Sequence, residues 1–409
     1  MPTTRINDLP REVIGAKILT RVPVTSLRHV RSTCKSWDAL TKSWILGHEA
    51  TSTEQFLGFM TMNSKVFTIR FQCKQKGDSV DLSMQQVDLL NQFDISQVFH
   101  TQGLLLCVTK NKSKSKQLMV WNPYLHQTRF IRPLRKFRTR DRYALGYDVD
   151  GNHKIMRFWN RSPPGGGKEV CEIYSLSSDS WRVLKVTPDW DIGYSRIGVS
   201  VKGNTYFYAG DKCDDEVGDF LVYFDFTREE FGPRLLLPFY SIYEELVTLS
   251  CVGDEKLAVL YYQEGMNYDG ILEIWVTRVE PDCVSWSSFL RVDLSSFPPT
   301  GVRFDEFDGG SFFIDEREKV AVVFDLGGIP PNETNRTARD QIAYIIGEDG
   351  LFESVCLGEA PNLGVRCPKT GYLPLIHDHA LVCSPSFRPS LVSLVQDKQP
   401  PLKRQRRYV

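Results

Sequence analysis

Apolar positions in the first 48 residues recur with a helical period. Ile14, Ile18 and Val22 are spaced four residues apart, which places them on one face of an amphipathic helix. Proline is favoured in the first helical turn, whereas the residue before a proline disfavours helical backbone. We therefore expect a helix that starts near Pro10 and ends at Val22-Pro23.

Two further short helices are predicted downstream. Thr25 or Ser26 can cap a second helix that carries Leu27 and Val30. A third is marked by apolar residues at three- and four-residue spacings, namely Cys34, Trp37, Leu40 and Trp44. Three short helices cannot bury all these side chains against each other, so we expect a partner or a neighbouring domain to complete their core.

Beyond the helices the pattern becomes strand-like and repeats. Short apolar or aromatic runs alternate with turns rich in Gly, Asp, Asn and Pro. One series of runs, separated by roughly 50 to 60 residues, is centred on Leu105, Ile155, Tyr206, Ala258, Val320 and Leu381. A second series follows it and is centred on Trp121, Tyr174, Phe224, Trp275 and Tyr344.

A period of roughly 50 residues, with several strands in each unit, is typical of kelch-type β-propellers. The predicted fold class is mainly β: a small three-helix unit followed by a β-propeller-like domain of about six units. The early strands Phe56–Phe59 and Val66–Phe71 are expected to pair with a C-terminal strand near Leu391–Val395, because closing the ring removes exposed sheet edges. The aromatic residues that recur in each unit indicate core packing rather than a binding pocket.

Composition and charge narrow the function classes. Apolar residues make up 42% of the chain and charged residues 24%, an ordinary globular balance, and no apolar run is as long as a membrane span. Net charge is zero, which argues against general nucleic-acid binding. The first 48 residues nevertheless carry +5 (eight Lys/Arg minus three Asp/Glu), and the tail 398–409 carries another +5 (five minus none).

The N-terminus lacks the apolar core of a signal peptide, and the ten cysteines include no Cys-x-x-Cys pair. We therefore expect a protein of the nucleus or the cytoplasm, with no membrane partner, no zinc site and no dense disulfide framework.

No set of residues predicts catalysis or a cofactor. The glycine-rich stretch 163–169 lacks the spacing of a phosphate loop, and Gly193–Gly198 misses the nucleophile-elbow pattern by one position. His377 and His379 would share one face of a strand, but two ligands do not make a zinc site. We expect no catalytic residue, no cofactor and no metal.

A basic segment is the strongest candidate for target binding. Seven cations, interleaved with Phe130 and Phe137, form this segment: Arg129, Arg132, Arg135, Lys136, Arg138, Arg140 and Arg142. A cationic loop with aromatic anchors can bind an acidic or phosphorylated segment. The alternative is a solvated loop whose charge the rest of the chain balances. The acidic stretch Asp211–Asp219 has a weaker claim, and its spacing does not fit a calcium loop.

Six short motifs lie in the N-terminal region: Leu9-Pro10, Ile18-Leu19, Arg21-Val22-Pro23, Ser26-Leu27, Val30-Arg31 and Cys34-Lys35-Ser36-Trp37. In order, spacing and chemistry they resemble the F-box motif of plant F-box proteins. The resemblance implies that nine residues pack on a Skp-type adaptor, or shape the surface for it: Leu9, Pro10, Ile14, Ile18, Leu19, Val22, Pro23, Leu27 and Trp37. The stretch from Leu9-Pro10 to Ile18-Leu19 is one residue longer than the commonest F-box spacing and contains Gly15. The alternative is an ordinary helical subdomain that serves the core of the larger domain.

Further motifs follow: Trp121-Asn122-Pro123, Gly146-Tyr147-Asp148, Ser180-Trp181-Arg182, Lys202-Gly203-Asn204, Tyr206 and Phe224-Asp225. They resemble the F-box-associated domain that follows the F-box in a large plant family and is taken to be a protein-interaction module.

Together the two resemblances imply a non-catalytic subunit of a Skp-cullin-F-box ubiquitin ligase. Residues 1–48 would be the F-box, residues 49–397 the associated β-propeller-like domain, and residues 398–409 a basic tail. The F-box would bind a Skp-type adaptor and, through it, a cullin, while the β domain would bind an unknown target protein. Two alternatives are an F-box protein that acts as a scaffold outside any ligase, and a glycan-binding propeller.

Overall fold

The computed structural model describes these residues of the chain: 9–10, 13–19, 22, 26–46, 56–72, 81–110, 116–135, 141–159, 170–186, 188–193, 197–212, 214, 217–241, 246–263, 270–280, 283–294, 311–327, 337–348, 350–364, 380–384 and 387–395.

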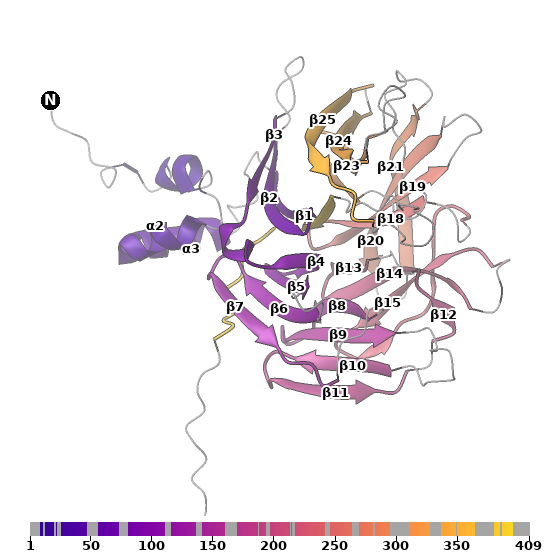
Figure 1. Ribbon diagram of the computed structural model, residues 1–409, viewed down its shortest axis with the longest axis horizontal. Coiled ribbons are helices and arrows are strands. Elements are labelled where there is room, and N and C mark those ends of the chain that lie inside the picture. The colour runs from indigo at the N-terminus through magenta and orange to yellow at the C-terminus, as the bar shows by residue number, and fades with distance from the viewer. Residues whose placement is uncertain are drawn as a thin grey trace, which may run out of the picture.

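The helical part of the described chain lies at its N-terminal end (Figure 1). It contains a π-helix, η2 (Ile14–Ile18), and two α-helices, α2 (Leu27–Thr33) and α3 (Lys35–Leu46). The prediction of a three-helix unit is therefore not confirmed, because a single π-helical turn stands where the first helix was expected. Only α2 and α3 are α-helices within these residues.

The π-helix has a local cause in the sequence. The backbone N–H of Leu19 donates to the carbonyl oxygen of Ile14, five residues earlier, and to that of Gly15. A π-turn holds one residue more than an α-turn. Ile14 and Leu19, five positions apart, are consequently both buried. The one-residue excess in the spacing before Ile18-Leu19 thus coincides with a helix type that absorbs it.

The remaining described residues form a mainly β, six-bladed propeller, as the repeat period predicted. Each blade is an antiparallel sheet whose first strand is innermost and whose last is outermost. Blade 1 contains β26 (Leu381–Ser384), β1 (Phe56–Met62), β2 (Lys65–Gln72) and β3 (Asp81–Gln86). Blade 2 contains β4 (Asp94–Thr101), β5 (Leu104–Lys110), β6 (Lys116–Asn122) and β7 (Gln127–Ile131). Blade 3 contains β8 (Arg142–Tyr147), β9 (His153–Trp159), β10 (Val170–Ser175) and β11 (Ser180–Leu184).

Blade 4 has additional short strands: β12 (Trp190–Asp191), β13 (Val199–Val201), β14 (Asn204–Asp211), β15 (Phe220–Asp225), β16 (Glu230–Phe231) and β17 (Leu235–Leu236). Blade 5 contains β18 (Leu246–Val252), β19 (Lys256–Gln263), β20 (Ile271–Glu280) and β21 (Cys283–Asp293). Blade 6 contains β22 (Ser311–Asp315), β23 (Val320–Leu326), β24 (Arg339–Gly347) and β25 (Phe352–Ala360). A 3-10 helix, η6 (Asp88–Leu90), lies between blades 1 and 2 in the chain.

Packing between blades explains why the repeat was visible in the sequence. In β5, Leu105 and Cys107 belong to the apolar cluster between blades 1 and 2, whereas Leu104, Leu106 and Val108 belong to the cluster between blades 2 and 3. A strand that is buried on both faces has a continuous apolar run instead of an alternating one. The first series of runs therefore marks second strands, and the second series marks third strands. One member of the first series, the run at Leu381, is an exception.

The ring closes through a different strand from the one predicted. β1 pairs with β26, with Thr61 opposite Leu381 and Met60 opposite Val382. The expected partner near Leu391–Val395 forms no strand, and the Leu381 run is the innermost strand of blade 1 rather than the second strand of another unit. The prediction was wrong on this point because an innermost strand and a second strand both appear as short apolar runs.

Two buried polar side chains of blade 6 hold the closing strand on its other side. Ser311 Oγ donates to the carbonyl of Ala380 (2.8 Å) and accepts from the N–H of Val382 (2.9 Å). Gln341 Oε1 accepts from the N–H of Ala380 (3.1 Å). Because β26 bonds to β1 through a ladder and to blade 6 through these side chains, it joins the first and last blades.

The two faces of the propeller differ in their connections. In blades 2 to 6, the first and second strands, and the third and fourth, are joined by short turns such as 102–103 and 123–126. Because the strands are antiparallel, all these turns lie on one face, which we call the turn face. Longer connections, such as 160–169 and 212–219, start and end on the opposite face, which we call the loop face. In Figure 1 the turn face is on the left, with the helices, and the loop face is on the right.

The C-terminal segment 387–395 runs along the turn face of blade 2. The Phe387 ring packs edge-on against Phe59 (4.9 Å between centroids), and Asn122 Nδ2 donates to the carbonyls of Ser390 (3.0 Å) and Val392 (2.9 Å). Gly103 in the β4–β5 turn has φ +74, and a Cβ there would lie 2.2 Å from the Arg388 carbonyl oxygen. Glycine is needed here both for its backbone conformation and for the close approach of this segment.

Two buried histidines near the turn face predict a pH dependence of stability. Burial lowers the pKa of His100 from 6.5 to about 3, with a smaller contribution from nearby His153, and burial lowers the pKa of His153 to about 4. Each ring binds a proton more weakly in the folded chain than in the unfolded chain. Stability is therefore fully present above pH 6.5 and is lost as pH falls from there towards the folded pKa values.

We expect the unfolding free energy of the wild type to fall on going from pH 7 to pH 5, with a slope below pH 6.5 of up to about 1.4 kcal/mol per pH unit for each histidine. In the variant His153→Phe, the part of this pH slope that comes from the two histidines should be about half as large, because one titrating group is gone. Urea unfolding at several pH values measures the slopes. Identical slopes in the two proteins would contradict the assignment.

Candidate functional site

The structure places the nine residues predicted to form the adaptor-binding surface in different environments. Ile14, Leu19 and Leu27 are buried within the chain. Leu9, Ile18, Val22 and Trp37 are half-buried, Pro10 is exposed, and Pro23 lies outside the described residues. Five of the nine therefore keep surface open to a partner, and Val13, close to Pro10 in the chain, is also 37% exposed.

Leu27 faces the propeller rather than solvent. Its side chain is 2% exposed and belongs to the apolar cluster between blades 1 and 2, against which Val22 also packs. The same cluster contains Tyr124 of the β6–β7 turn and Phe387 of the C-terminal segment. Of the predicted adaptor-binding residues, Leu27 is thus positioned to attach the helices to the ring, and it can only shape the adaptor surface indirectly.

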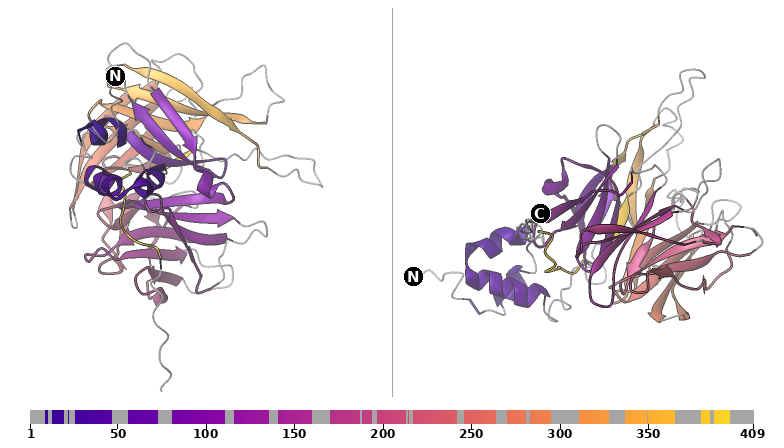
Figure 2. Two further views of the ribbon diagram at one scale, coloured as in Figure 1. Left: turned by 90° about the vertical axis from the view of Figure 1, so that its left-hand side faces the viewer. Right: turned by 90° about the horizontal axis from the view of Figure 1, so that it is seen from below.

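Arg31 on α2 links the helices to the propeller electrostatically. Its Nε donates to Asp38 of α3 (2.8 Å), its Nη1 donates to the Tyr124 carbonyl (3.2 Å), and its guanidinium lies 4.3 Å from the Tyr124 ring centroid. Hydrogen bonds from Lys42 and Arg31 lower the pKa of Asp38. Figure 2 shows α2 and α3 beside the blades, with the yellow C-terminal segment nearby. A carboxylate, a guanidinium and an aromatic ring therefore join three parts of the chain.

Two residues of the basic segment are already engaged within the propeller. Arg129 donates to the Tyr174 hydroxyl (3.0 Å) and the Leu176 carbonyl (3.0 Å), and it forms an ion pair with Asp179 (2.7 Å). Arg142 donates to the Gly193 carbonyl (2.7 Å) and to the preceding carbonyl. These two cations connect neighbouring blades and are not displayed for a partner.

Other residues of the segment are presented to solvent on the loop-face side. Arg132 and Arg135 are exposed, and so are Phe130 (49%) and Leu134 (50%). The Phe130 ring packs edge-on against Phe93 (5.7 Å), which orients it. Lys136, Phe137, Arg138 and Arg140 lie outside the described residues. The exposed part thus combines cations with apolar side chains.

A buried ion network holds two points of this segment, residues 135 and 141. Arg157, fully buried on β9, forms ion pairs with Asp141 (2.6 Å) and Glu172 (3.0 Å), and it also donates to the Arg135 carbonyl (2.9 Å). Arg135 Nε lies 3.5 Å from the other Glu172 oxygen. Because Arg157 binds residue 135 and residue 141 together, the two ends of the stretch between them are fixed to blade 3.

Arg157, Glu172 and Tyr124 were not identified from the sequence. A usable signal existed for the first two, because each is a charged residue within an otherwise apolar strand run. A charge in such a position is buried only when it is paired. Tyr124 follows the Trp121-Asn122-Pro123 motif and shows its role only once α2 is placed.

The motifs that resemble the F-box-associated domain have structural roles. Asn122 Oδ1 accepts from the Leu125 N–H (3.0 Å), which closes the β6–β7 turn, while its amide holds the C-terminal segment. Trp181 Nε1 donates to the Arg132 carbonyl (2.7 Å) on the neighbouring blade. Trp121, Tyr174 and Phe224 are buried, whereas Trp181 and Trp275 are half-buried. These positions therefore serve packing and turn closure.

No chemical site comes together in the described part of the chain. Among those residues, no three His, Cys, Asp or Glu side chains are grouped so that they could hold a metal ion. The pair His377 and His379 and the glycine-rich stretch 163–169 lie outside them. The expectation of no cofactor and no catalytic residue stays a prediction. None of the described helices is long and apolar enough to cross a membrane.

The Arg157 network predicts a large effect of one substitution. Arg157→Met leaves Asp141 and Glu172 buried without their shared cation, so the unfolding free energy should drop by about 3–5 kcal/mol. The control Arg135→Ala removes a half-exposed cation and should cost less than about 1 kcal/mol. Chemical denaturation measures both. Equal effects of the two substitutions would show that the network does not hold the segment.

Comparisons with known proteins agree with this architecture. The family described as "F-box associated beta propeller domain" matches residues 57–394. Three F-box/kelch-repeat proteins of Arabidopsis thaliana are each 51% identical to this chain, over 97% of it and 93% of their own length. A further F-box/kelch-repeat protein from that plant is 46% identical, over 97% and 98% of the two chains.

Similarity to solved structures is weak by comparison. A hypothetical selenium-binding protein from Sulfolobus tokodaii aligns with a TM-score of 0.38 and 8% identity over 75% of this chain and 81% of that one. The family match spans nearly the whole propeller, and the relatives match over nearly the whole chain. The chain therefore belongs to the family of F-box proteins that carry an F-box-associated β-propeller domain.

Proposed function

We propose that this protein is the substrate-recognition subunit of a Skp-cullin-F-box ubiquitin ligase. Its F-box residues bind a Skp-type adaptor and, through it, a cullin, while its propeller binds a target protein. The observation that carries the proposal is the separation of two surfaces. The helices adjoin the turn face of blades 1 and 2, and the longer connections start and end on the opposite face.

In this proposal the chain performs no chemistry itself. Other subunits transfer ubiquitin, and this one contributes proximity, which alone lowers a reaction barrier by several kcal/mol. Proximity is effective only if the target is held in a limited range of orientations. The contacts of Leu27 and Arg31 with the ring support such an arrangement, because they fix α2 to the propeller.

The adaptor surface is proposed to centre on Leu9, Pro10, Ile18 and Trp37. These side chains are exposed or half-buried in the described chain, so each still has surface to bury against a partner. Ile14 and Leu19 support them from within. A partner that covers this apolar surface completes the small helical core, which three short helical segments cannot complete alone.

Replacing two of these residues should uncouple the adaptor. We expect Leu9→Ala with Pro10→Ala to weaken adaptor binding at least tenfold, because the variant removes apolar surface at the contact. The matched control is Lys35→Ala with Ser43→Ala, two exposed positions on α3. Binding of the purified protein to immobilised adaptor measures the effect. Unchanged binding in the first variant would refute the proposed adaptor surface.

We further propose that the exposed part of the basic segment contacts the target. Arg132, Arg135 and Phe130 are all exposed, and Lys136, Arg138 and Arg140 follow in the sequence. Arginine clusters with aromatic neighbours bind acidic or phosphorylated peptides. Arg129 and Arg142 support the segment from within the propeller instead of contacting the target.

A charge reversal tests this assignment. With the proteasome inhibited, Arg132→Glu with Arg135→Glu should lose most of the ubiquitinated protein that co-purifies with the wild type, while the adaptor is retained. The control Arg228→Glu with Arg317→Glu reverses two exposed cations on the turn face. Loss of ubiquitinated protein in both variants, or in neither, would count against the segment. Absence of any ubiquitinated protein from the wild type would favour a scaffold outside a ligase.

A further inference from the structure

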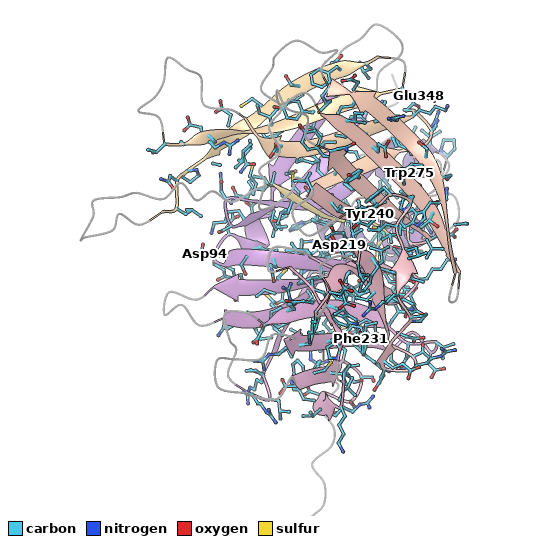
Figure 3. The ribbon with its side chains drawn as sticks, turned by 90° about the vertical axis from the view of Figure 1, so that its right-hand side faces the viewer. Asp94, Asp219, Phe231, Tyr240, Trp275 and Glu348 are labelled. Atoms are coloured by element: carbon cyan, nitrogen blue, oxygen red, sulfur yellow. The ribbon has the colours of Figure 1, made fainter. Side chains whose placement is uncertain are left out.

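Blade 4 holds an exposed aromatic side chain in a fixed position on the loop face. Tyr240 is labelled in Figure 3. It is 67% exposed, yet both its neighbours are anchored. The Phe239 ring stacks on Tyr261 at 4.2 Å with an interplanar angle of 9°. Ser241 is fully buried. The exposure of Tyr240 is therefore imposed by the residues on either side of it.

Hydrogen bonds fix the backbone at this point. The Ser241 carbonyl accepts from the Asp219 N–H (2.9 Å), and Ser241 Oγ lies 3.0 Å from the Tyr208 hydroxyl, which also contacts the Asp219 carboxylate. The Tyr240 ring lies over Gly218, where a Cβ would come within 2.8 Å of the ring. Only glycine at position 218 leaves room for the ring in this place.

Two more apolar side chains of blade 4 are exposed. Val217, next to Gly218, is 42% exposed, and Leu236 is 80% exposed. Leu236 pairs with Phe220 in the ladder, and its carbonyl accepts from Trp286 Nε1 of blade 5 (2.9 Å). We call Val217, Leu236 and Tyr240 the blade-4 platform. Rigid, exposed aromatic and aliphatic groups of this kind are typical of binding surfaces, because little side-chain entropy is lost when they are covered.

The sequence on both sides of Val217 and Tyr240 is acidic. Residues 211–219 contain five Asp or Glu and one Lys, a net charge of −4 (1 − 5), and Glu244 and Glu245 follow Tyr240 in the sequence. Arg234 of the same blade is neutralised by Asp189 and Asp211 (both 2.8 Å) and lies 4.3 Å from the Phe220 ring centroid. A positively charged partner is attracted to this surface, whereas an anionic one is repelled.

The basic segment 129–142 has the opposite sign, at +6 (seven Lys/Arg minus Asp141), on blades 2 and 3. Both charged regions belong to connections on the loop face. A target that bridges them must present an acidic part to one and a basic part to the other, so complementary charges set its orientation.

We propose that the blade-4 platform binds a positively charged segment of the target protein, whose aliphatic or aromatic side chains pack on Tyr240 and Leu236. This proposal rests on the proposed function, because it names the chemistry of the target at the same face. Nucleic acid does not fit the site, since its phosphates would meet the carboxylates.

The test uses the full chain co-purified with its adaptor and three pools of fluorescein-labelled 12-residue peptides. All pools contain Leu, Trp and Tyr; they differ in carrying Lys and Arg, Asp and Glu, or only Ser and Gly in addition. Fluorescence anisotropy should show the cationic pool binding at least tenfold more tightly than the other two. Tyr240→Ser with Leu236→Ser should weaken that binding at least tenfold, and Asp214→Lys should weaken it several-fold.

Matched controls lie on the turn face. Val149→Ser removes an 81% exposed apolar side chain there, and Glu348→Lys reverses an exposed charge there; neither should change binding of the cationic pool. Equal binding of all pools, no binding by any pool, or unchanged affinity in the double variant would overturn the proposal. If the cationic pool binds but the adaptor does not co-purify, the platform stands and the ligase function fails.

Discussion

The pairing of β26 with β1 joins the two ends of the propeller, and much of the remaining geometry follows from it. β26 is connected to β1 by a short ladder and to blade 6 by Ser311 and Gln341, whose side chains bond the backbone of residues 380–382. The apolar cluster between blades 6 and 1, which contains Met60, Phe71 and Phe313, is completed only when β26 is in place. Without this strand, the innermost position of blade 1 would be empty and two sheet edges would be exposed.

Closure also decides where the two proposed binding surfaces lie. The chain enters β1 and leaves β26 on the turn face, so the helices and the C-terminal segment meet there. Leu27, Tyr124 and Phe387 come from distant parts of the sequence and share one apolar cluster for that reason. The opposite face is left to the connections between second and third strands and between blades. Under the proposed function, this division would put the adaptor and the target on opposite faces of the propeller.

Charge is used in two ways in this propeller. Inside blade 3, the charge of Arg157 is compensated by Asp141 and Glu172. These buried charges hold residues 135 and 141 of the basic segment and are not available to a partner. On the loop face, basic and acidic stretches lie on different blades, and several of their charges remain exposed. A neutral total charge conceals this arrangement, because the opposite regions cancel in the sum. The net charge was informative about nucleic acid in general but not about local recognition.

The sequence by itself determined the architecture that depends on local pattern. Most second and third strands of blades 2 to 6 are buried on both faces, so their apolar runs recur with the propeller period and predicted about six units. The helical spacings around Leu27 and Trp37, and the motifs that resemble an F-box, likewise depend on neighbours close in the chain. Tertiary structure alone decided which C-terminal strand closes the ring, which cations of the basic segment are engaged internally, and that Leu27 faces the propeller. Each of these depends on contacts between residues far apart in the sequence, and a run of apolar or charged residues has the same pattern whether its partner is another blade, another protein or water.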